Sequence, residues 1–445
     1  MKRILVLGSG FTAKPLVDYL YAQNDYHLTV TGLTVEEAQN VTKNRDHTTA
    51  MALNIMDDAA VSEQIGSHDF VASMLPYEFH TRVAKMCVAQ HKSMLTTSYA
   101  KEEIYQLDKP AREKSVLILK EVGLDPGFDH ISAMQIIHNV KAKGGRIISF
   151  KSYAGGFPAP DADTNPWHYK FSWSPKGVLV AAKSDATYMQ DGKVINMAGK
   201  DILQHTWPIQ IDGVSYEAYP NRDSLPYLQR YHLEDTPSIM RATLRYPGWT
   251  EMMSAVHHLG LLDDQPIDDP AGMSYRQIFE RITGLHGELR PALQQRVKDS
   301  NIEAIYSKLD WLGLFSNKIF TATKSPLRPI DFLVKLMIDN MQYSPGERDM
   351  VLLYHDFIAA YPDHHERITA RLLEYGEPNG YMAMSKTVGL PAAVAAHLYL
   401  QGKIQLSGVQ IPVVPEIYQP VLEELLQLGI GYSERIEPLE AARMP

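Results

Sequence analysis

A short apolar run followed at once by a glycine-rich turn opens this chain and constrains its fold more than any other stretch. Residues 4–7 (Ile-Leu-Val-Leu) have the length and composition of a buried parallel strand. The pattern Gly8-x-Gly10-x-x-Ala13 follows directly, and a helical pattern begins behind it. In such an arrangement the first glycine makes the tight turn, the second lets the backbone approach a pyrophosphate, and the small third residue lets helix and strand pack closely. The stretch predicts a dinucleotide-binding unit, although the same turn also fits an ordinary strand-to-helix connection.

Strands and helices are predicted to alternate along the first part of the chain. The strand candidates are residues 2–7, 28–31, 50–53, 70–75, 94–97 and 116–122, with helical segments such as 12–23, 35–44 and 80–91 between them. Such alternation with short connections predicts an α/β fold built on a doubly wound parallel sheet. The ligand crevice of such a sheet lies beyond the carboxyl ends of its strands. We therefore expect the loops 73–76 and 96–99 to line the crevice.

The composition and the hydrophobic pattern change twice in the remainder of the chain. Residues 149–246 are rich in Gly, Pro, Trp and Tyr, and they predict a second, mixed-sheet domain. Its strand candidates are 145–153, 178–182 and 214–219. From residue 251 to 339 the pattern turns helical, and Thr250 is the expected N-cap of the first helix. Further helices are expected around 275–285, 288–299, 302–312, 330–341 and 380–400, with a strand at 350–356.

Composition excludes several classes of protein. The chain has 445 residues, enough for two or three domains, and its net charge of −9 argues against general nucleic-acid binding. No apolar run approaches the length of a membrane span. Cys87 is the single cysteine, so no intrachain disulfide can form, and no cleavable signal is visible; we expect a cytoplasmic protein. The histidines His355, His364 and His365 lack a carboxylate and the spacing of a metal site, so no metal is expected.

The end of the second strand leaves the choice between NAD and NADP open. An acidic residue there would accept hydrogen bonds from the ribose of NAD, and an arginine would bind the 2′-phosphate of NADP. Residues 31–34 (Thr-Gly-Leu-Thr) contain neither. Thr34 could donate a hydrogen bond to a phosphate, and Lys43 or Arg45 could reach it. These residues favour neither cofactor.

Candidate chemical groups gather after residue 122. Asp125 precedes the turn Pro126-Gly127 at the carboxyl end of a predicted strand, where it would face the crevice or simply cap the turn. In the second domain, Arg222 and Arg245 stand beside turn-forming residues. Arginines at such positions suit bidentate binding of carboxylates, although each could equally form a structural ion pair.

Several long motifs together resemble one family. They are residues 7–15 (LGSGFTAKP), 96–99 (TTSY), 123–127 (GLDPG), 155–160 (GGFPAP), 169–175, 219–224, 243–247, 346–353 and 375–389. In these motifs the chain resembles, from end to end, the saccharopine dehydrogenases of the L-glutamate-forming type, also called saccharopine reductases. Position 33 departs from the pattern, because it is leucine where an NADP-preferring member would often carry arginine.

The resemblance implies a fold and an activity. It implies a Rossmann domain (1–124 and 390–445), a mixed α/β substrate and dimerisation domain (125–250 and 342–389) and an inserted all-helical domain (251–341). It further implies a homodimer. The implied reaction is the reversible reduction, by NADPH or NADH, of the imine formed by L-glutamate and 2-aminoadipate 6-semialdehyde, which gives saccharopine. NADP is the expected cofactor and NAD the alternative.

The resemblance also assigns roles to individual residues. The implied cofactor-binding residues are Gly8, Ser9, Gly10, Phe11, Thr12, Thr34, Leu75, Asp125 and Trp173. The implied substrate-binding residues are Ser98, Tyr99, Arg222, Thr243, Leu244 and Arg245. Because a secondary amine must lose a proton before its carbon gives up a hydride, we expect a general base, for which Asp125 and Tyr99 are the candidates and Lys101 and His130 the reserves.

Two other functions stay open at this level. One is a related reductive condensation, of the carboxynorspermidine or homospermidine synthase type. A diamine substrate favours acidic side chains, whereas this chain places arginines beside the turns. The other is a regulatory protein that binds NAD(P) without turnover, which would need neither Asp125, Tyr99 nor the arginines. Because the reaction is reversible, the sequence does not distinguish lysine synthesis from lysine degradation.

Overall fold

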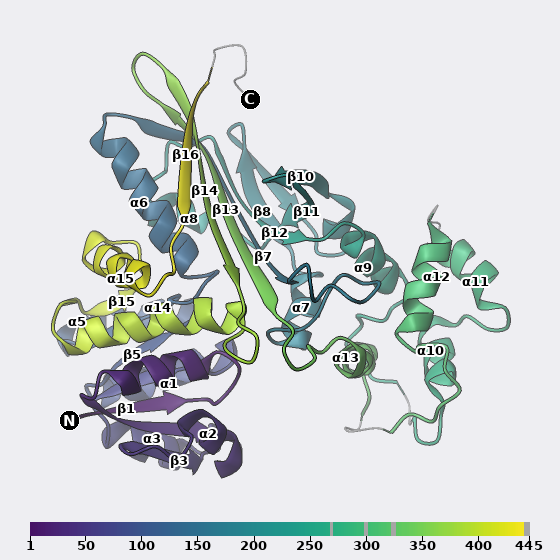
Figure 1. Ribbon diagram of the computed structural model, residues 1–445, viewed down its shortest axis with the longest axis horizontal. Coiled ribbons are helices and arrows are strands. Elements are labelled where there is room, and N and C mark those ends of the chain that lie inside the picture. Colours follow the sequence, from purple (N-terminus) through teal and green to yellow (C-terminus); the bar gives the residue numbers. More distant parts are fainter. Residues whose placement is uncertain (268–269, 298–300, 322–325, 440–445) are drawn as a thin grey trace. The chain divides into compact units, whose positions relative to one another are not determined.

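The computed structural model describes residues 1–267, 270–297, 301–321 and 326–439 (Figure 1). The chain forms two compact units. Unit 1 contains residues 1–148, the short segment 230–233, and the chain from residue 350 to the end of the described part. Unit 2 contains 149–229 and the described residues between 234 and 349.

Unit 1 is built on a seven-stranded sheet in the order β15-β6-β5-β4-β1-β2-β3. Its strands are β1 (Lys2–Leu7), β2 (Tyr26–Gly32), β3 (Thr48–Ala52), β4 (Phe70–Ser73), β5 (Ser93–Thr96), β6 (Leu117–Leu119) and β15 (Gly408–Gln410). All neighbouring strands pair in parallel. The order reverses between β1 and β4, which is where a doubly wound sheet opens its crevice.

Helices connect and cover these strands. They are α1 (Ala13–Ala22), α2 (Val35–Thr42), α3 (Asp58–Gly66), η1 (Tyr77–Phe79), α4 (His80–Ala89), η2 (Glu102–Leu107) and α5 (Asp108–Glu113). Leu5 and Leu7 of β1 are buried in a cluster with residues of α3, α4 and α5, Cys87 among them. Because side chains alternate along a strand, Ile4 and Val6 point to the opposite face, and they are buried too. The sheet is therefore covered on both faces.

The C-terminal part of the chain returns to this sheet. Helix α14 (Ala383–Leu400) packs against α1 (Figure 1). Strand β15 then pairs with β6. A side-chain carbon on Gly389 would lie 2.6 Å from the carbonyl oxygen of Thr12, so the absent side chain lets the two helices approach. Unit 1 also holds α6 (Phe128–Ala142), α15 (Pro415–Gln427) and the antiparallel strands β13 (Asp349–Ala360), β14 (His365–Tyr375) and β16 (Ser433–Leu439).

Unit 2 joins a mixed sheet to a group of helices. Its strands are β7 (Arg146–Pro158), β8 (Ala186–Gln190), β9 (Lys193–Met197), β10 (Trp207–Ile211), β11 (Val214–Pro220) and β12 (Ser238–Arg245). Strand β12 runs parallel to β7 and antiparallel to β11. The helices are α7 (Pro175–Ala181), η3 (Ile202–Gln204), α8 (Pro226–Arg230), α9 (Trp249–His258), α10 (Tyr275–Thr283), α11 (Leu289–Val297), α12 (Ile302–Trp311) and α13 (Pro329–Asn340).

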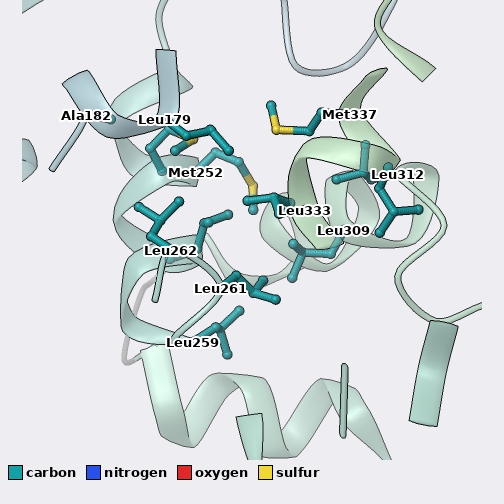
Figure 2. Close-up of a cluster of buried hydrophobic side chains, with 14 of the residues drawn as sticks. Leu179, Ala182, Met252, Leu259, Leu261, Leu262, Leu309, Leu312, Leu333 and Met337 are labelled. Carbon is teal, nitrogen blue, oxygen red and sulfur yellow. The ribbon is translucent and has the colours of Figure 1, made fainter. Parts of the chain in front are cut away.

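The core of unit 2 corrects one expectation from the sequence. Residues 178–182 were expected to form a strand, but they belong to helix α7 and its C-cap. Figure 2 shows Leu179 and Ala182 packed with leucines and methionines of the α9, α12 and α13 region. Ser174 caps the helix by accepting a hydrogen bond from the Gly177 amide, and Pro175 occupies its first turn. The β-branched Val178 and Val180 suggested a strand, but the cap and the helical neighbours decide the local structure.

A second correction concerns the start of α9. Thr250 was expected to be its N-cap, whereas Gly248 is the N-cap, with a φ of +89°. Thr250 lies inside the helix, and its amide donates to Oε1 of Glu217 at 2.5 Å. The Gly248 amide donates to Oε2 of the same side chain at 3.2 Å. A carboxylate from β11 therefore caps the helix, which local sequence cannot reveal.

The fold class expected from the sequence is confirmed: a doubly wound parallel sheet, a second mixed sheet and a helical region. The division into three domains at the stated boundaries stays a prediction.

Candidate active site

The glycine turn lies at the switch point of the parallel sheet, between the ends of β1 and β4. Gly8 has a φ of +105°, and a side-chain carbon there would lie 3.1 Å from the carbonyl oxygen of Met74. At Gly10, by contrast, a side-chain carbon would meet no atom within 4 Å. Ala13 is fully buried at the start of α1. The turn therefore leaves open space over the amino end of α1, where the helix dipole favours a phosphate group.

Phe11 and Thr12 complete this turn. Phe11 is exposed, and Thr12 is the N-cap of α1 without a side-chain hydrogen bond to the helix. Ser9 lies toward the end of β2, because its Oγ is 2.7 Å from the place of a side-chain carbon on Gly32. These residues fit a bound dinucleotide, because both the backbone and the open volume that its pyrophosphate needs are present.

The residues that follow β2 are those expected near the 2′-position of the ribose in a bound dinucleotide. Thr34 is the N-cap of α2, and its hydroxyl accepts a hydrogen bond from the Glu37 amide at 3.2 Å. In return, Oε2 of Glu37 accepts from the Leu33 amide at 2.9 Å. The Leu33 side chain is 79% exposed. Arg45, which the sequence left as a possible phosphate ligand, is held by Asp18 at 2.7 Å and lies over the Tyr21 ring.

Tyr99 and Asp125 come together at the ends of β5 and β6. The hydroxyl of Tyr99 donates to Oδ1 of Asp125 over 3.4 Å. Gly123 allows the two loops to approach, because a side-chain carbon there would lie 2.5 Å from the Thr97 carbonyl oxygen. Gly127 allows the turn itself to close, because a side-chain carbon there would lie 2.1 Å from the Gly123 carbonyl oxygen. From residue 116 to 134 every residue but Asp125 is buried. Asp125 is thus the one carboxylate of this turn that reaches an accessible surface.

Leu75 and Ser98 border the same edge of the sheet. Both are half-buried, and each lies two residues beyond the carboxyl end of a strand, β4 for Leu75 and β5 for Ser98. Lys101, a reserve candidate for the base, is exposed at the start of η2. Unit 1 therefore gathers the glycine turn, Leu75, Ser98, Tyr99 and Asp125 at one edge of its sheet.

His130, the other reserve candidate, lies in a buried polar network. Its Nδ1 is 2.5 Å from the Tyr231 hydroxyl, and its Nε2 is 3.0 Å from Oε2 of Glu121. Glu121 also forms an ion pair with Lys120, and both side chains are buried. Burial alone would raise the pKa of Glu121, but the hydrogen bond from His130 and the charge of Lys120 hold it well below its usual range. The sequence did not predict this network, because Tyr231 comes from a distant segment.

Arg245 is a buried, positively charged residue of unit 2 that lies against two aromatic rings. It is 4% exposed at the end of β12, and its guanidinium lies 5.3 Å from the centre of the Tyr169 ring and 5.6 Å from that of Trp249. Its Nη1 donates to the Leu244 carbonyl oxygen at 2.8 Å, while Nε has no hydrogen-bond partner. Within the described part of the chain, no carboxylate oxygen lies within 4 Å of it. Glu217 is directly opposite on β11, but its carboxylate caps α9.

The other substrate and cofactor candidates of unit 2 lie on two loops and on β12. Thr243 and Leu244 are buried on that strand beside Arg245. Trp173 is half-buried before α7 and, like Arg245, interacts with Tyr169. Arg222 is exposed in a turn with a φ of +56°, and its carbonyl oxygen accepts from the Thr187 amide at 2.9 Å. In unit 2, Trp173 and Arg245 therefore both interact with Tyr169, whereas Arg222 lies on a separate turn.

Among the described residues, no group of three or more His, Cys, Asp or Glu side chains could hold a metal ion. Nor does any helix in the described ranges have the length and apolar character that crossing a membrane requires.

A glycine turn at the switch point of a parallel sheet, beside a phenol and a carboxylate, is typical of dinucleotide-dependent oxidoreductases. Two family models match this chain: the saccharopine dehydrogenase NADP binding domain over residues 4–119, and the saccharopine dehydrogenase C-terminal domain over residues 123–430. The chain therefore belongs to the saccharopine dehydrogenase family.

Individual relatives extend the comparison to nearly the full length. A saccharopine dehydrogenase [NADP(+), L-glutamate-forming] of Pyricularia oryzae is 37% identical over 98% of this chain and 99% of its own length. The mitochondrial alpha-aminoadipic semialdehyde synthase of Bos taurus is 34% identical over 97% of this chain, which corresponds to 47% of that longer protein. The solved structure of apo saccharopine dehydrogenase (L-Glu forming) from Saccharomyces cerevisiae matches with a TM-score of 0.88 and 35% identity, over 98% of this chain and 100% of that chain.

Proposed function

We propose that this chain is an L-glutamate-forming saccharopine dehydrogenase that uses NADP, in lysine metabolism. The observation that carries this proposal is the extent of the similarity. Relatives of that printed name match over 98% of the chain, not over the dinucleotide-binding domain alone. A substrate with three carboxylates needs local cations in a net negative protein, and the buried Arg245 supplies one.

The reaction couples a proton transfer to a hydride transfer. In the oxidative direction, saccharopine, NADP⁺ and water give L-glutamate, 2-aminoadipate 6-semialdehyde, NADPH and a proton. NADP⁺, when bound, accepts the hydride. The secondary amine must first lose its proton, and the carbon–nitrogen double bond that forms must then take up water. The protein has to position these groups and receive the proton.

Asp125 and Tyr99 are our proposed proton-handling residues. The carboxylate of Asp125 is the accessible group of a buried turn, and the Tyr99 hydroxyl donates to it. Passage of a proton between the two groups would require the 3.4 Å contact to shorten. We propose Arg222, Ser98 and residues 243–245 for the substrate carboxylates. For the cofactor we propose the glycine turn, Thr34, Leu75, Asp125 and Trp173.

We also propose a homodimer, as the resemblance to the family implies, and a cytoplasmic location. A single buried cysteine agrees with a reducing compartment.

A direct assay tests the activity. Purified protein is mixed with saccharopine and either NADP⁺ or NAD⁺, and the absorbance of the reduced cofactor is followed. We expect turnover with saccharopine and a higher kcat/KM with NADP⁺. Turnover only with a diamine and aspartate semialdehyde would instead indicate a reductive condensation of polyamines. Cofactor binding without turnover on any of these substrates would indicate a regulatory protein.

A further inference from the structure

His80 is a fully buried histidine that contacts the hydroxyl groups of three residues at the carboxyl edge of the parallel sheet. It is the first residue of α4. Its Nδ1 lies 3.0 Å from Oγ of Ser73, the last residue of β4. Its Nε2 lies 2.8 Å from Oγ1 of Thr96, the last residue of β5, and 2.7 Å from Oγ of Ser98. One ring therefore connects the ends of two strands to a residue that we place in the substrate site.

The charge state of the ring determines what it can do. Burial lowers the pKa of His80 to about 4, so the imidazole is neutral at physiological pH. A neutral imidazole donates through one nitrogen and accepts through the other. We assign the tautomer in which Nδ1 accepts from the Ser73 hydroxyl and Nε2 carries the single proton. Both Ser98 and Thr96 lie within hydrogen-bond distance of Nε2, and we assign the donated hydrogen bond to the nearer oxygen, that of Ser98.

That donation decides the direction of the Ser98 hydroxyl. Once Oγ of Ser98 accepts from Nε2, the O–H of Ser98 must point elsewhere. Its acceptor within the protein is the Tyr99 carbonyl oxygen at 3.4 Å, well beyond the roughly 2.7 Å of a good O–H···O bond. Ser73 and Thr96 are fully buried, whereas Ser98 is half-buried. Of the three hydroxyls, that of Ser98 is the one that can turn to a ligand in the crevice.

We propose that His80 is a positioning residue for the substrate: it holds the Ser98 hydroxyl as a donor to a carboxylate of saccharopine. The inference rests on the proposed function and on the placing of Ser98 in the substrate site. His80 itself contacts neither substrate nor cofactor. Its role is to orient the hydroxyl before the substrate arrives, so that binding does not require the hydroxyl to change partners.

Two substitutions of His80 test its contact with Ser73 and its contact with Ser98 separately. In His80→Gln the longer side chain can place an amide N–H near the position of Nε2, which preserves a donor to Ser98. In His80→Asn the shorter side chain reaches the position of Nδ1 only, so the contact with Ser73 can remain while that with Ser98 is lost. We expect His80→Asn to raise the KM for saccharopine roughly tenfold to hundredfold, as loss of a hydrogen bond to a charged group predicts. His80→Gln should restore most of this loss.

His68 provides a matched control in the same unit. It is also buried, its Nδ1 is 2.6 Å from the Gln64 carbonyl oxygen, and its Nε2 is 2.8 Å from the Thr29 hydroxyl. His68→Asn therefore removes an equivalent buried contact away from the crevice. It should lower the melting temperature without changing the KM for saccharopine. NADPH binding, measured by fluorescence, reports the folded fraction of every variant.

The pairing with Ser98 is tested by a double-mutant cycle. If His80 acts through Ser98, His80→Asn should raise the KM no further in a Ser98→Ala background. Three outcomes would overturn the proposal: equal KM values for His80→Asn and the wild type, equal effects of the Asn and Gln variants on KM, or additive effects with Ser98→Ala. A wild-type protein without saccharopine turnover would instead refute the proposed function, and this result is distinct because it is seen before any substitution.

Discussion

The hydroxyl of Tyr99 lies 3.4 Å from Oδ1 of Asp125, although the two residues are 26 positions apart in the chain. The contact exists because β5 and β6 are parallel neighbours whose carboxyl ends meet at one edge of the sheet. Gly123 lets the two loops approach, since a side chain there would collide with the Thr97 carbonyl oxygen, and Gly127 lets its own turn close tightly on Gly123. The proposed proton-handling pair is thus a product of strand order and two glycines.

Removing the Tyr99 hydroxyl should slow the chemical step. We expect Tyr99→Phe to lower kcat roughly a hundredfold, because proton transfer by a positioned group contributes on the order of 10²–10⁴. The KM for NADP⁺ should stay near that of the wild type. Tyr21→Phe is the control, since that ring lies under Arg45 in the last turn of α1. Steady-state kinetics decide the matter, and a Tyr99→Phe enzyme with unchanged kcat would exclude the phenol from proton transfer.

Arg245 should contribute to the binding of saccharopine while it lowers the stability of the folded protein. A buried guanidinium without a nearby carboxylate costs free energy, and replacing such a charge with an apolar side chain of similar size is often neutral or stabilising. We therefore expect Arg245→Met to keep or raise the melting temperature while it raises the KM for saccharopine at least tenfold. Thermal unfolding and kinetics on the same sample test both halves. A large loss of stability would mean that the arginine is structural.

Arg222 should act on the substrate and not on the cofactor. It is exposed on a turn of unit 2. We expect Arg222→Ala to raise the KM for saccharopine strongly while the affinity for NADP⁺ changes little. Titration of cofactor binding by fluorescence provides the comparison. If both affinities fell together, the arginine would have to be assigned a structural role.

Leu33 should be a position from which cofactor preference can be changed. Its side chain is 79% exposed at the end of β2, where an arginine could reach a 2′-phosphate. We expect Leu33→Arg to lower the KM for NADP⁺ about tenfold, in line with a charge-assisted hydrogen bond. The KM for NAD⁺ should not change, because NAD⁺ has no phosphate at that position. An equal change for both cofactors would place residue 33 away from the 2′-position.

Glu121 should make stability depend on acid pH. Its pKa is lower in the folded state than in the unfolded chain, so the unfolded state binds more protons as the pH falls. The stabilisation is present above the unfolded pKa of roughly 4.3 and is lost progressively below it. We expect Glu121→Gln to cost about 3 kcal/mol at neutral pH, because Lys120 is left buried without its charge partner.

Urea unfolding at several pH values tests the acid dependence of Glu121. The difference between wild type and Glu121→Gln should shrink as the pH falls below about 4. Glu437→Gln is the control, since its partner Arg435 is exposed and such pairs contribute little. A difference that stayed constant with pH would show that the carboxylate is not charged in the folded state.

Local sequence was sufficient for the parallel sheet and the glycine turn. The apolar run 4–7, the alternation of strand and helix periods and the spacing of Gly8 and Gly10 are local properties, and each is realised in the structure. Similar local signals predicted most of the helices in residues 251–341. Even the proposed site residues of unit 1 could be placed at one edge, because strand ends of a parallel sheet share that edge by construction.

Tertiary structure decided what depends on partners that are distant in the chain. Residues 178–182 form a helix because α9, α12 and α13 give their apolar side chains a helical surface to pack on. His80 acquires its proposed role only where β4 and β5 bring Ser73, Thr96 and Ser98 to one ring. Arg245 differs from an ordinary ion-paired arginine because the carboxylate opposite it is engaged in capping α9. Hydrophobic periodicity and turn chemistry act between near neighbours, whereas burial, charge and hydrogen-bond partners are set by the packed fold.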